Sequence, residues 1–198
     1  MNATPISRLP KIPVKKSTAK EFWEFAKGKD ERYELIDGRI YMMASPNVNH
    51  QRIAREILRK VANYLESKPC EPFIAPLDVV LFEKDEETDG SQNVFQPDVF
   101  VVCDPEKIAD ERIYGAPDFI AEIVSPSTSA NDYFHKCKVY MQYGVKEYWV
   151  INPETKNILV YINGEEVETY SYTFEDKIKV SIFGDFEIDF KNLNIKGE

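Results

Sequence analysis

The chain has 198 residues, of which 43% are hydrophobic and 30% charged, a size and composition typical of one globular domain with a substantial core. No stretch approaches the roughly 18 uninterrupted apolar residues of a membrane-spanning helix, so we expect no membrane association. The net charge of -9 disfavours a protein that binds nucleic acid through a broad basic face, although a local basic strip could still serve.

The N-terminal residues indicate where the domain begins, and the cysteines indicate the redox compartment. Residues 1–16 are partly basic without an apolar segment, which predicts a flexible tail rather than a secretory signal, followed by a single domain over residues 17–198. The cysteines, at positions 70, 103 and 137, are odd in number, far apart and without a CxxC pair. This pattern predicts neither a disulfide framework nor a zinc site, and it favours small buried thiols in a reducing cytoplasm.

The first third of the chain predicts two helices and a hairpin. A short helix is expected over residues 17–27, and a hairpin over residues 32–44 turns at Asp37-Gly38. Apolar residues recur at helical spacing over residues 49–65, which predicts the main amphipathic helix.

The rest of the chain predicts a sheet. β-rich segments indicate strands over residues 72–82, 94–102, 117–124 and 146–151, with a helix over residues 131–143. Later alternating segments, with a turn at Asn163-Gly164, predict antiparallel strands. The expected fold class is therefore α/β or α+β, with a mixed central sheet flanked by helices.

Two acids interrupt the apolar strands. Asp98 shares a strand face with Phe100, and Glu122 shares one with Ile120, because side chains alternate along a strand. A buried carboxylate must be paired, protonated or bound to a cation, so neighbouring acids suggest a site for a hard divalent ion, provided that the strands pair in the right register. Alternatively, turn amides satisfy Asp98 and a local partner satisfies Glu122.

Lys136 lies at the edge of the apolar side of the predicted helix, a side expected to include Phe134 and Tyr140. A lysine in this position can bury its stem and direct its amine inward, where it would orient a water or stabilise developing charge. Alternatively, Lys136 forms an ordinary i,i+4 pair with Asp132.

The remaining candidates have plainer interpretations. Glu34 is a lone acid near the hairpin turn, and His50 is interpreted as a helix cap or a core histidine rather than a ligand. A group of basic residues forms either a solvated surface or a nucleic-acid strip, with the solvated surface favoured. The group consists of Lys15, Lys16, Arg52, Arg55, Arg59 and Lys60.

Taken in order, five segments together resemble the Uma-two family of proposed restriction endonucleases, within the PD-(D/E)XK nuclease superfamily. The resemblance covers roughly residues 17 to 153. The segments are residues 34–38 (ELIDG), 97–99 (PDV), 121–127 (AEIVSPS), the spaced Asp132, Lys136 and Tyr140, and residues 144–149 (GVKEYW).

The resemblance implies a restriction-endonuclease-like fold that hydrolyses phosphodiester bonds with Mg²⁺ or Mn²⁺. It makes Asp98 and Glu122 metal ligands, Glu34 a further acid and metal ligand in the site, and Lys136 the catalytic lysine. In one departure, the usual E-x-K spacing would need a lysine where Val124 stands, so Lys136 must substitute from the following helix. The dipeptide Pro117-Asp118 is a second literal PD, so the choice of Asp98 depends on the resemblance.

The leading hypothesis is a cytoplasmic Mg²⁺-dependent DNA endonuclease. Duplex cleavage needs two cuts, which makes a homodimer the expected assembly. Two other hypotheses stay open: a nuclease-fold binding or regulatory protein without turnover, and a structural domain whose acids are satisfied locally.

Overall fold

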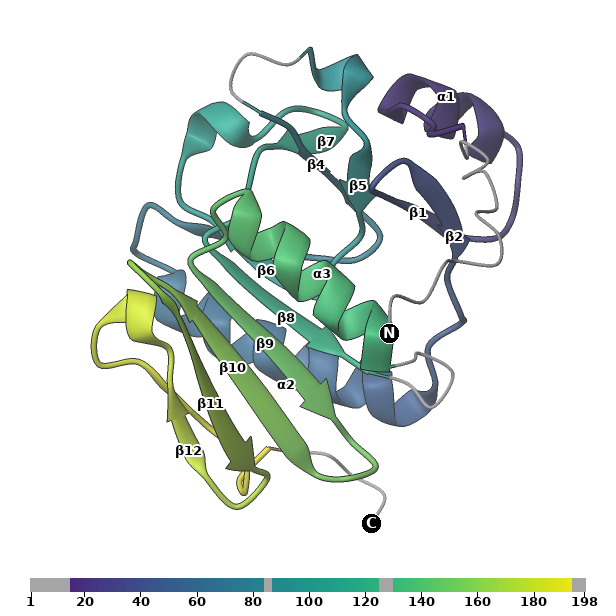
Figure 1. Ribbon diagram of the computed structural model, residues 1–198. Coiled ribbons are helices and arrows are strands. Elements are labelled where there is room, and N and C mark those ends of the chain that lie inside the picture. Colours follow the sequence, from purple (N-terminus) through teal and green to yellow (C-terminus); the bar gives the residue numbers. More distant parts are fainter. Residues whose placement is uncertain (1–14, 84–86, 125–129, 194–198) are drawn as a thin grey trace, which may run out of the picture.

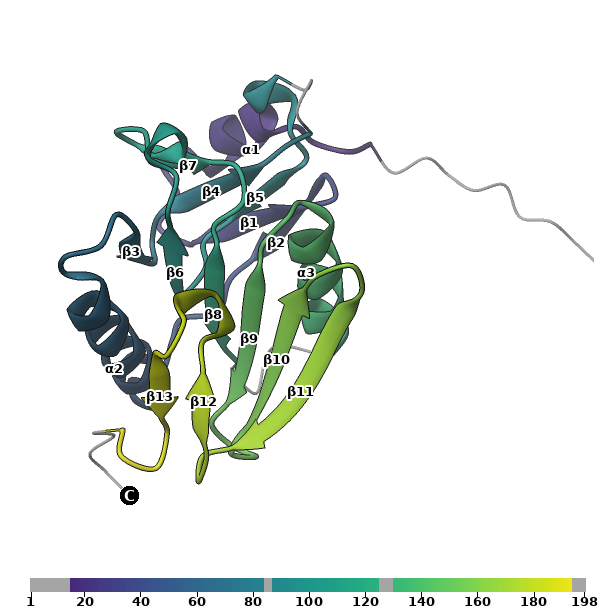
Figure 2. The same cartoon turned by 90° about the vertical axis from the view of Figure 1, so that its left-hand side faces the viewer.

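The computed structural model describes residues 15–83, 87–124 and 130–193, except for the side chains of residues 130–132. Its largest sheet has six strands in the order β11-β10-β9-β8-β6-β3, and only β8 and β9 run parallel. Helices α2 (Val48–Leu65) and α3 (Ala130–Gln142) lie on opposite sides of this sheet (Figures 1 and 2). The strands are β3 (Glu71–Ile74), β6 (Val99–Val102), β8 (Phe119–Ile123), β9 (Glu147–Asn152), β10 (Asn157–Asn163) and β11 (Val167–Thr173). The expectation of a mixed sheet flanked by helices is confirmed.

A second sheet of five strands, in the order β2-β1-β5-β4-β7, is covered by α1 (Ala19–Ala26). Its strands are β1 (Tyr33–Ile36), β2 (Arg39–Met42), β4 (Asp78–Leu81), β5 (Asn93–Phe95) and β7 (Arg112–Tyr114). The smaller elements are the 3-10 turns η1 (Thr88–Gly90), η2 (Pro105–Lys107) and η3 (Ser181–Phe183), and the pair β12 (Lys177–Lys179) and β13 (Glu187–Asp189). Within the described ranges, no helix is long and apolar enough to cross a membrane.

Local chemistry explains the first elements. Thr18 and Glu21 form a capping box at the start of α1, and the β1–β2 turn places Asp37 and Gly38 at positive φ, as a tight hairpin turn requires. The side chain of Asn47 caps α2 by accepting a hydrogen bond from the His50 amide at 2.9 Å. The helices and hairpin expected here are confirmed, with small differences at their ends.

The single strands expected over residues 72–82 and 94–102 are wrong. Each segment breaks near a proline, Pro76 or Pro97, and continues as a strand of the other sheet. Proline cannot donate a ladder hydrogen bond, so it ends the pairing at these points. As a result, Asp98 lies where the chain passes from the five-stranded to the six-stranded sheet.

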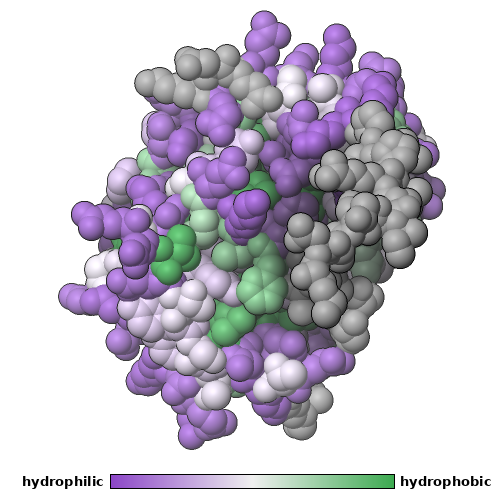
Figure 3. Space-filling model, in the orientation of Figure 1, coloured by the Kyte–Doolittle hydropathy of each residue, from purple (hydrophilic) through white to green (hydrophobic). Residues whose placement is uncertain are grey.

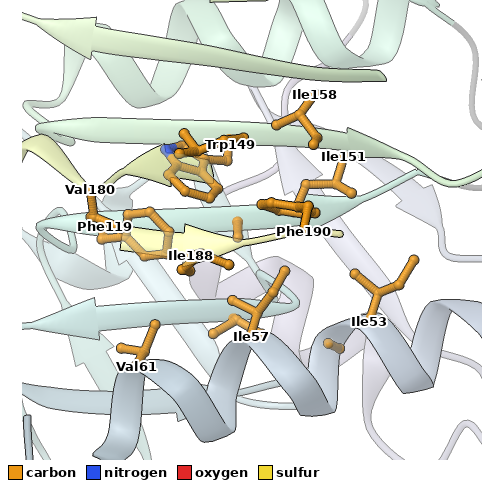
Figure 4. Packing of buried hydrophobic residues seen from close by; sticks show 14 of the residues in the cluster. Ile53, Ile57, Val61, Phe119, Trp149, Ile151, Ile158, Val180, Ile188 and Phe190 are labelled. Carbon is orange, nitrogen blue, oxygen red and sulfur yellow. The ribbon is translucent and has the colours of Figure 1, made fainter. Parts of the chain in front are cut away.

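Both faces of the six-stranded sheet are packed. On one face, Ile53 and Ile57 of α2 pack in a cluster with Phe119, Trp149 and Ile188 (Figure 4). Such close packing of large side chains, which fixes the strand positions, is the main source of the fold's stability.

Helix α3 covers the other face, with Cys137, Val139 and Tyr140 buried. The expected inward position of Phe134 is wrong, because this side chain is 67% exposed, whereas Lys136 is only 9% exposed. Compared with the expectation, α3 is therefore rotated about its axis. Lys136 points toward the sheet, where it contacts buried carboxylates. Figure 3 shows that this face of the molecule is largely hydrophilic, with apolar residues gathered near its centre.

The cysteines differ from the expectation. Cys70 and Cys103 form a disulfide, because the β3–β6 register that pairs Glu71 with Val102 places them opposite each other one residue further on. Their separation of 33 residues hides this pairing in the sequence. Cys137 is a buried free thiol, as expected. Of the tail expected over residues 1–16, all but the last two residues lie outside the described ranges.

Candidate active site

The strand register brings Asp98 and Glu122 together. Strands β6 and β8 are antiparallel with Val99 opposite Ala121, so the next pair along is Asp98 and Glu122. The amide of Ile123 donates to Oδ2 of Asp98 at 2.8 Å, which joins the two strands at this end. Asp98 and Glu122 are 9% and 7% exposed, so both carboxyl groups are largely withdrawn from water.

Lys136 reaches this point from α3. Its Nζ lies 2.8 Å from Oε2 of Glu34 and 3.0 Å from Oε1 of Glu122. The alternative of an i,i+4 pair involves the side chain of Asp132, which lies outside the described part of the chain. The described partners of Lys136 are thus acids brought from two different sheets.

Glu34 enters the site from the five-stranded sheet. It lies on β1, which pairs with β5, and its Oε1 accepts a hydrogen bond from the Gln96 amide at 3.0 Å. Gln96 lies in the segment that joins the two sheets, so one backbone amide fixes Glu34 beside the start of β6. The lone acid of the hairpin is therefore a buried member of the cluster, at 4% exposure.

Burial and charge set the protonation of the cluster. Burial, opposed by Lys136 and aided by Asp98 and Glu34, raises the pKa of Glu122 to about 7. Burial lowers the pKa of Lys136, but Glu122 and Glu34 outweigh it, so the net pKa is raised and the amine is charged. Tyr140 donates its hydroxyl to Oε1 of Glu122 at 3.0 Å, and burial raises its pKa well above the ordinary value.

His50 is the site residue that the sequence reasoning missed. It lies in the first turn of α2 and places Nε2 3.0 Å from Oδ2 of Asp98. Its position at the head of a long helix was visible in the sequence, but its approach to Asp98 depends on how α2 packs across the end of the sheet. The interpretation as a simple cap or core histidine is incomplete, because the side chain contacts a site carboxylate.

Among the described residues, these contacts use one oxygen of each neighbouring acid. Oδ2 of Asp98 meets both Ile123 and His50, and Oε1 of Glu122 accepts from both Lys136 and Tyr140. Oδ1 of Asp98 and Oε2 of Glu122 accept no hydrogen bond from any described residue. Both acids line a cavity of about 320 Å³ together with Glu34, His50 and Lys136.

The donor set fits a hard divalent ion held by two protein ligands. Mg²⁺ takes one or two carboxylates and completes its octahedron with waters and substrate phosphate oxygens, and the open oxygens of Asp98 and Glu122 match that need. Among the described residues, no group of three or more His, Cys, Asp or Glu side chains is arranged to hold a metal. Glu34, expected as a further ligand, contacts Lys136, and its role as a metal ligand stays a prediction.

The second PD dipeptide lies at the other end of β8. Oδ1 of Asp118 contacts Nζ of Lys146 at 2.6 Å, and its Oδ2 accepts the Cys103 amide at 2.8 Å. Both oxygens are occupied by the protein, so Asp118 has a structural role.

The basic residues of α2 are largely engaged within their own helix. Arg55 and Arg59 contact the buried carboxylate of Glu56 at 3.2 and 2.9 Å, and Arg52 donates to Asn49 at 3.2 Å. Both arginines that contact Glu56 are more than half exposed, in keeping with the favoured interpretation of a solvated helix face.

A family model and two relatives match this chain. The family model Uma2, described as "Putative restriction endonuclease", matches residues 19–191. The uncharacterized protein slr1290 of Synechocystis sp. is 25% identical over 188 residues, which cover 93% of this chain and 95% of that protein. A second Synechocystis protein, the uncharacterized sll1609, is 26% identical over 125 residues, which cover 62% of this chain and 67% of that protein.

A solved structure has the same fold. The crystal structure of "a putative nuclease belonging to DUF820" from Anabaena variabilis ATCC 29413 superposes with a TM-score of 0.72 at 20% identity. The match covers 91% of this chain and 97% of that chain, so the likeness extends over both sheets.

Proposed function

Because this chain belongs to the Uma2 family of restriction-endonuclease-like nucleases, we propose that it hydrolyses DNA phosphodiester bonds at the cavity beside Asp98 and Glu122 with a divalent metal. One observation carries the proposal: two buried acids, each with an oxygen that accepts no hydrogen bond from a described residue, share a cavity with a charged, buried lysine. A buried carboxylate without a full set of donors needs a cation or a proton, and a nuclease site uses the cation.

Asp98 and Glu122 would hold Mg²⁺ or Mn²⁺ through Oδ1 and Oε2. When bound, such an ion lowers the pKa of a water and offsets charge on the phosphate. His50 and the Ile123 amide fix the carboxylate plane of Asp98 through Oδ2, so His50 is a positioning residue in this proposal.

Lys136 supplies the positive charge of the site. Its amine would orient the attacking water and stabilise charge that develops on the phosphate oxygens. Glu34 holds the amine at 2.8 Å, so its role here is to position Lys136, while a role as third metal ligand stays a prediction.

The test is cleavage of supercoiled plasmid DNA in Mg²⁺ or Mn²⁺, with near-isosteric variants. Asp98→Asn and Lys136→Met are each expected to reduce the rate by at least about a thousandfold, because each removes a group that acts directly in the transition state. Asp118→Asn is the matched control, an equally buried PD aspartate with both oxygens satisfied, and should cleave at the wild-type rate.

Other outcomes separate the competing functions. Tight DNA binding without cleavage by the wild type would favour a binding or regulatory protein. Cleavage that survives Asp98→Asn would overturn the site assignment. The proposed homodimer predicts twice the chain mass in sedimentation equilibrium, and a monomer that still linearises plasmid would contradict it.

A further inference from the structure

Arg32 lies beside the acid cluster, yet neither the family motifs nor the proposed chemistry assigns it a role. It precedes Glu34 by two residues, and its carbonyl accepts the Met43 amide at 2.8 Å, which extends the β1–β2 ladder. Alternation along the strand therefore places Arg32 on the same side as Glu34. Both residues line the cavity that contains Asp98 and Glu122.

The guanidinium of Arg32 is held in a fixed orientation. Its Nε donates to Oε1 of Gln96 at 2.9 Å, and Nε2 of Gln96 donates to Oδ1 of Asp78 at 2.9 Å. The backbone amide of the same Gln96 binds Glu34. One residue at the junction of the sheets thus orients both the Glu34 carboxylate and the Arg32 guanidinium.

One nitrogen of this guanidinium is available to a ligand as far as the described residues show. Nη2 of Arg32 is buried and makes no hydrogen bond to any described residue. Three other basic side chains line the cavity, and each contacts a carboxylate: Lys136 meets Glu34 and Glu122, His50 meets Asp98, and His135 meets Asp37 at 2.7 Å. The described partner of Arg32 is a neutral amide, so no ion pair within the described ranges offsets its charge.

We propose that Arg32 binds a phosphate group of the substrate next to the phosphate that is cleaved. This inference rests on the proposed phosphodiester chemistry and names a second contact with the same substrate. A guanidinium presents paired N–H donors that match two oxygens of a phosphate, and a buried donor without a partner gains the most from such a ligand.

The rest of the cavity wall indicates what accompanies that phosphate. The segment from Tyr41 to Pro46 lines the cavity and contains no charged residue. Tyr41 and the methionines at 42 and 43 offer an aromatic ring and flexible apolar side chains that can contact a sugar or a base. An anion site beside an apolar wall fits a nucleotide better than a free inorganic anion.

The probe is thymidine 3′,5′-bisphosphate in the presence of Ca²⁺, titrated into the full chain by calorimetry. Arg32→Gln is expected to weaken binding by about tenfold or more, because a charge-assisted bidentate contact is lost. Arg39→Gln is the matched control, since Arg39 is an exposed residue of the same hairpin outside the cavity and its loss changes the net charge equally. Arg32→Lys should recover part of the affinity, because it keeps the charge without the fork.

The outcomes are distinct from those of the proposed function. Equal affinity of wild type and Arg32→Gln, equal weakening in Arg32→Gln and Arg39→Gln, or no binding by the wild type would each overturn the inference. If the bisphosphate binds through Arg32 but plasmid DNA stays intact, the contact of Arg32 with a nucleotide phosphate stands and the proposed turnover fails. Thermal unfolding of each variant confirms that the compared proteins are folded.

Discussion

A Pro-Asp dipeptide lies beside each end of strand β8, and the two aspartates have different surroundings. Asp98 and Asp118 each follow a proline, are at most 9% exposed and contact a backbone amide of a neighbouring strand. At the Asp118 end, Lys146 contacts the second oxygen, whereas at the Asp98 end both described donors share one oxygen, and the other accepts no hydrogen bond from a described residue and lines a cavity. An open oxygen, rather than burial or the PD dipeptide, distinguishes a candidate ligand from a structural acid.

Replacing the lysine at each end, Lys136 or Lys146, should give the largest difference in the free energy of unfolding. Lys136→Met leaves Glu34 and Glu122 buried without their cation, so we expect a loss of about 3–5 kcal/mol in the metal-free free energy of unfolding at neutral pH. Lys146→Met should cost less than about 1 kcal/mol, because the Lys146 side chain is 62% exposed. Urea denaturation of both variants measures the difference, and similar losses would contradict the assignment of two unlike ends.

Acidity provides the next test, because burial raises the pKa of Glu122 to about 7 in the folded protein. A raised pKa means that the folded state binds the proton of Glu122 more tightly than the unfolded state does. The resulting contribution to the free energy of unfolding is fully present below about pH 4.5 and is lost as the pH rises through about 7. Relative to Glu122→Gln, metal-free wild type should lose about 3 kcal/mol of unfolding free energy over that interval. If the difference in unfolding free energy between wild type and Glu122→Gln does not change with pH, the raised pKa of Glu122 is ruled out.

Two adjacent tyrosines offer the smallest contrast. The hydroxyl of Tyr140 donates to Glu122. The hydroxyl of Tyr148, whose ring centroid lies 5.0 Å from that of Tyr140, is buried and has no hydrogen-bond partner among the described residues. Tyr140→Phe should cost about 1–2 kcal/mol, and Tyr148→Phe should be neutral or slightly stabilising. Thermal unfolding of the two variants under identical conditions checks this difference, and similar stabilities would show that the Tyr140 contact is unimportant.

Alternation along the strands predicted that Asp98 shares a face with Phe100 and Glu122 with Ile120, whereas the register that brings the two acids together is seen only in the structure. Helical spacing likewise located α2 and α3. The prolines at 76 and 97 were visible, but the sequence does not show that the chain changes sheets there, because strand pairing is a long-range property.

The contacts that complete the site were beyond local reasoning. His50 reaches Asp98, and Arg32 reaches Gln96, only because different elements pack at the junction of the sheets. The sequence predicted Lys136 at the edge of the apolar side of α3 and Phe134 within that side. The buried partners Glu34 and Glu122 explain why Lys136 points inward while Phe134 is exposed.

The assignment of Asp98 as a metal ligand is tested most directly by Mn²⁺ binding to the folded protein, measured by electron paramagnetic resonance or calorimetry without DNA. We expect a bound ion in wild type and in Asp118→Asn, and its loss in Asp98→Asn, because of these two aspartates only Asp98 lines the cavity and has an oxygen that accepts no hydrogen bond from a described residue. Equal Mn²⁺ binding by Asp98→Asn and Asp118→Asn would contradict the central claim.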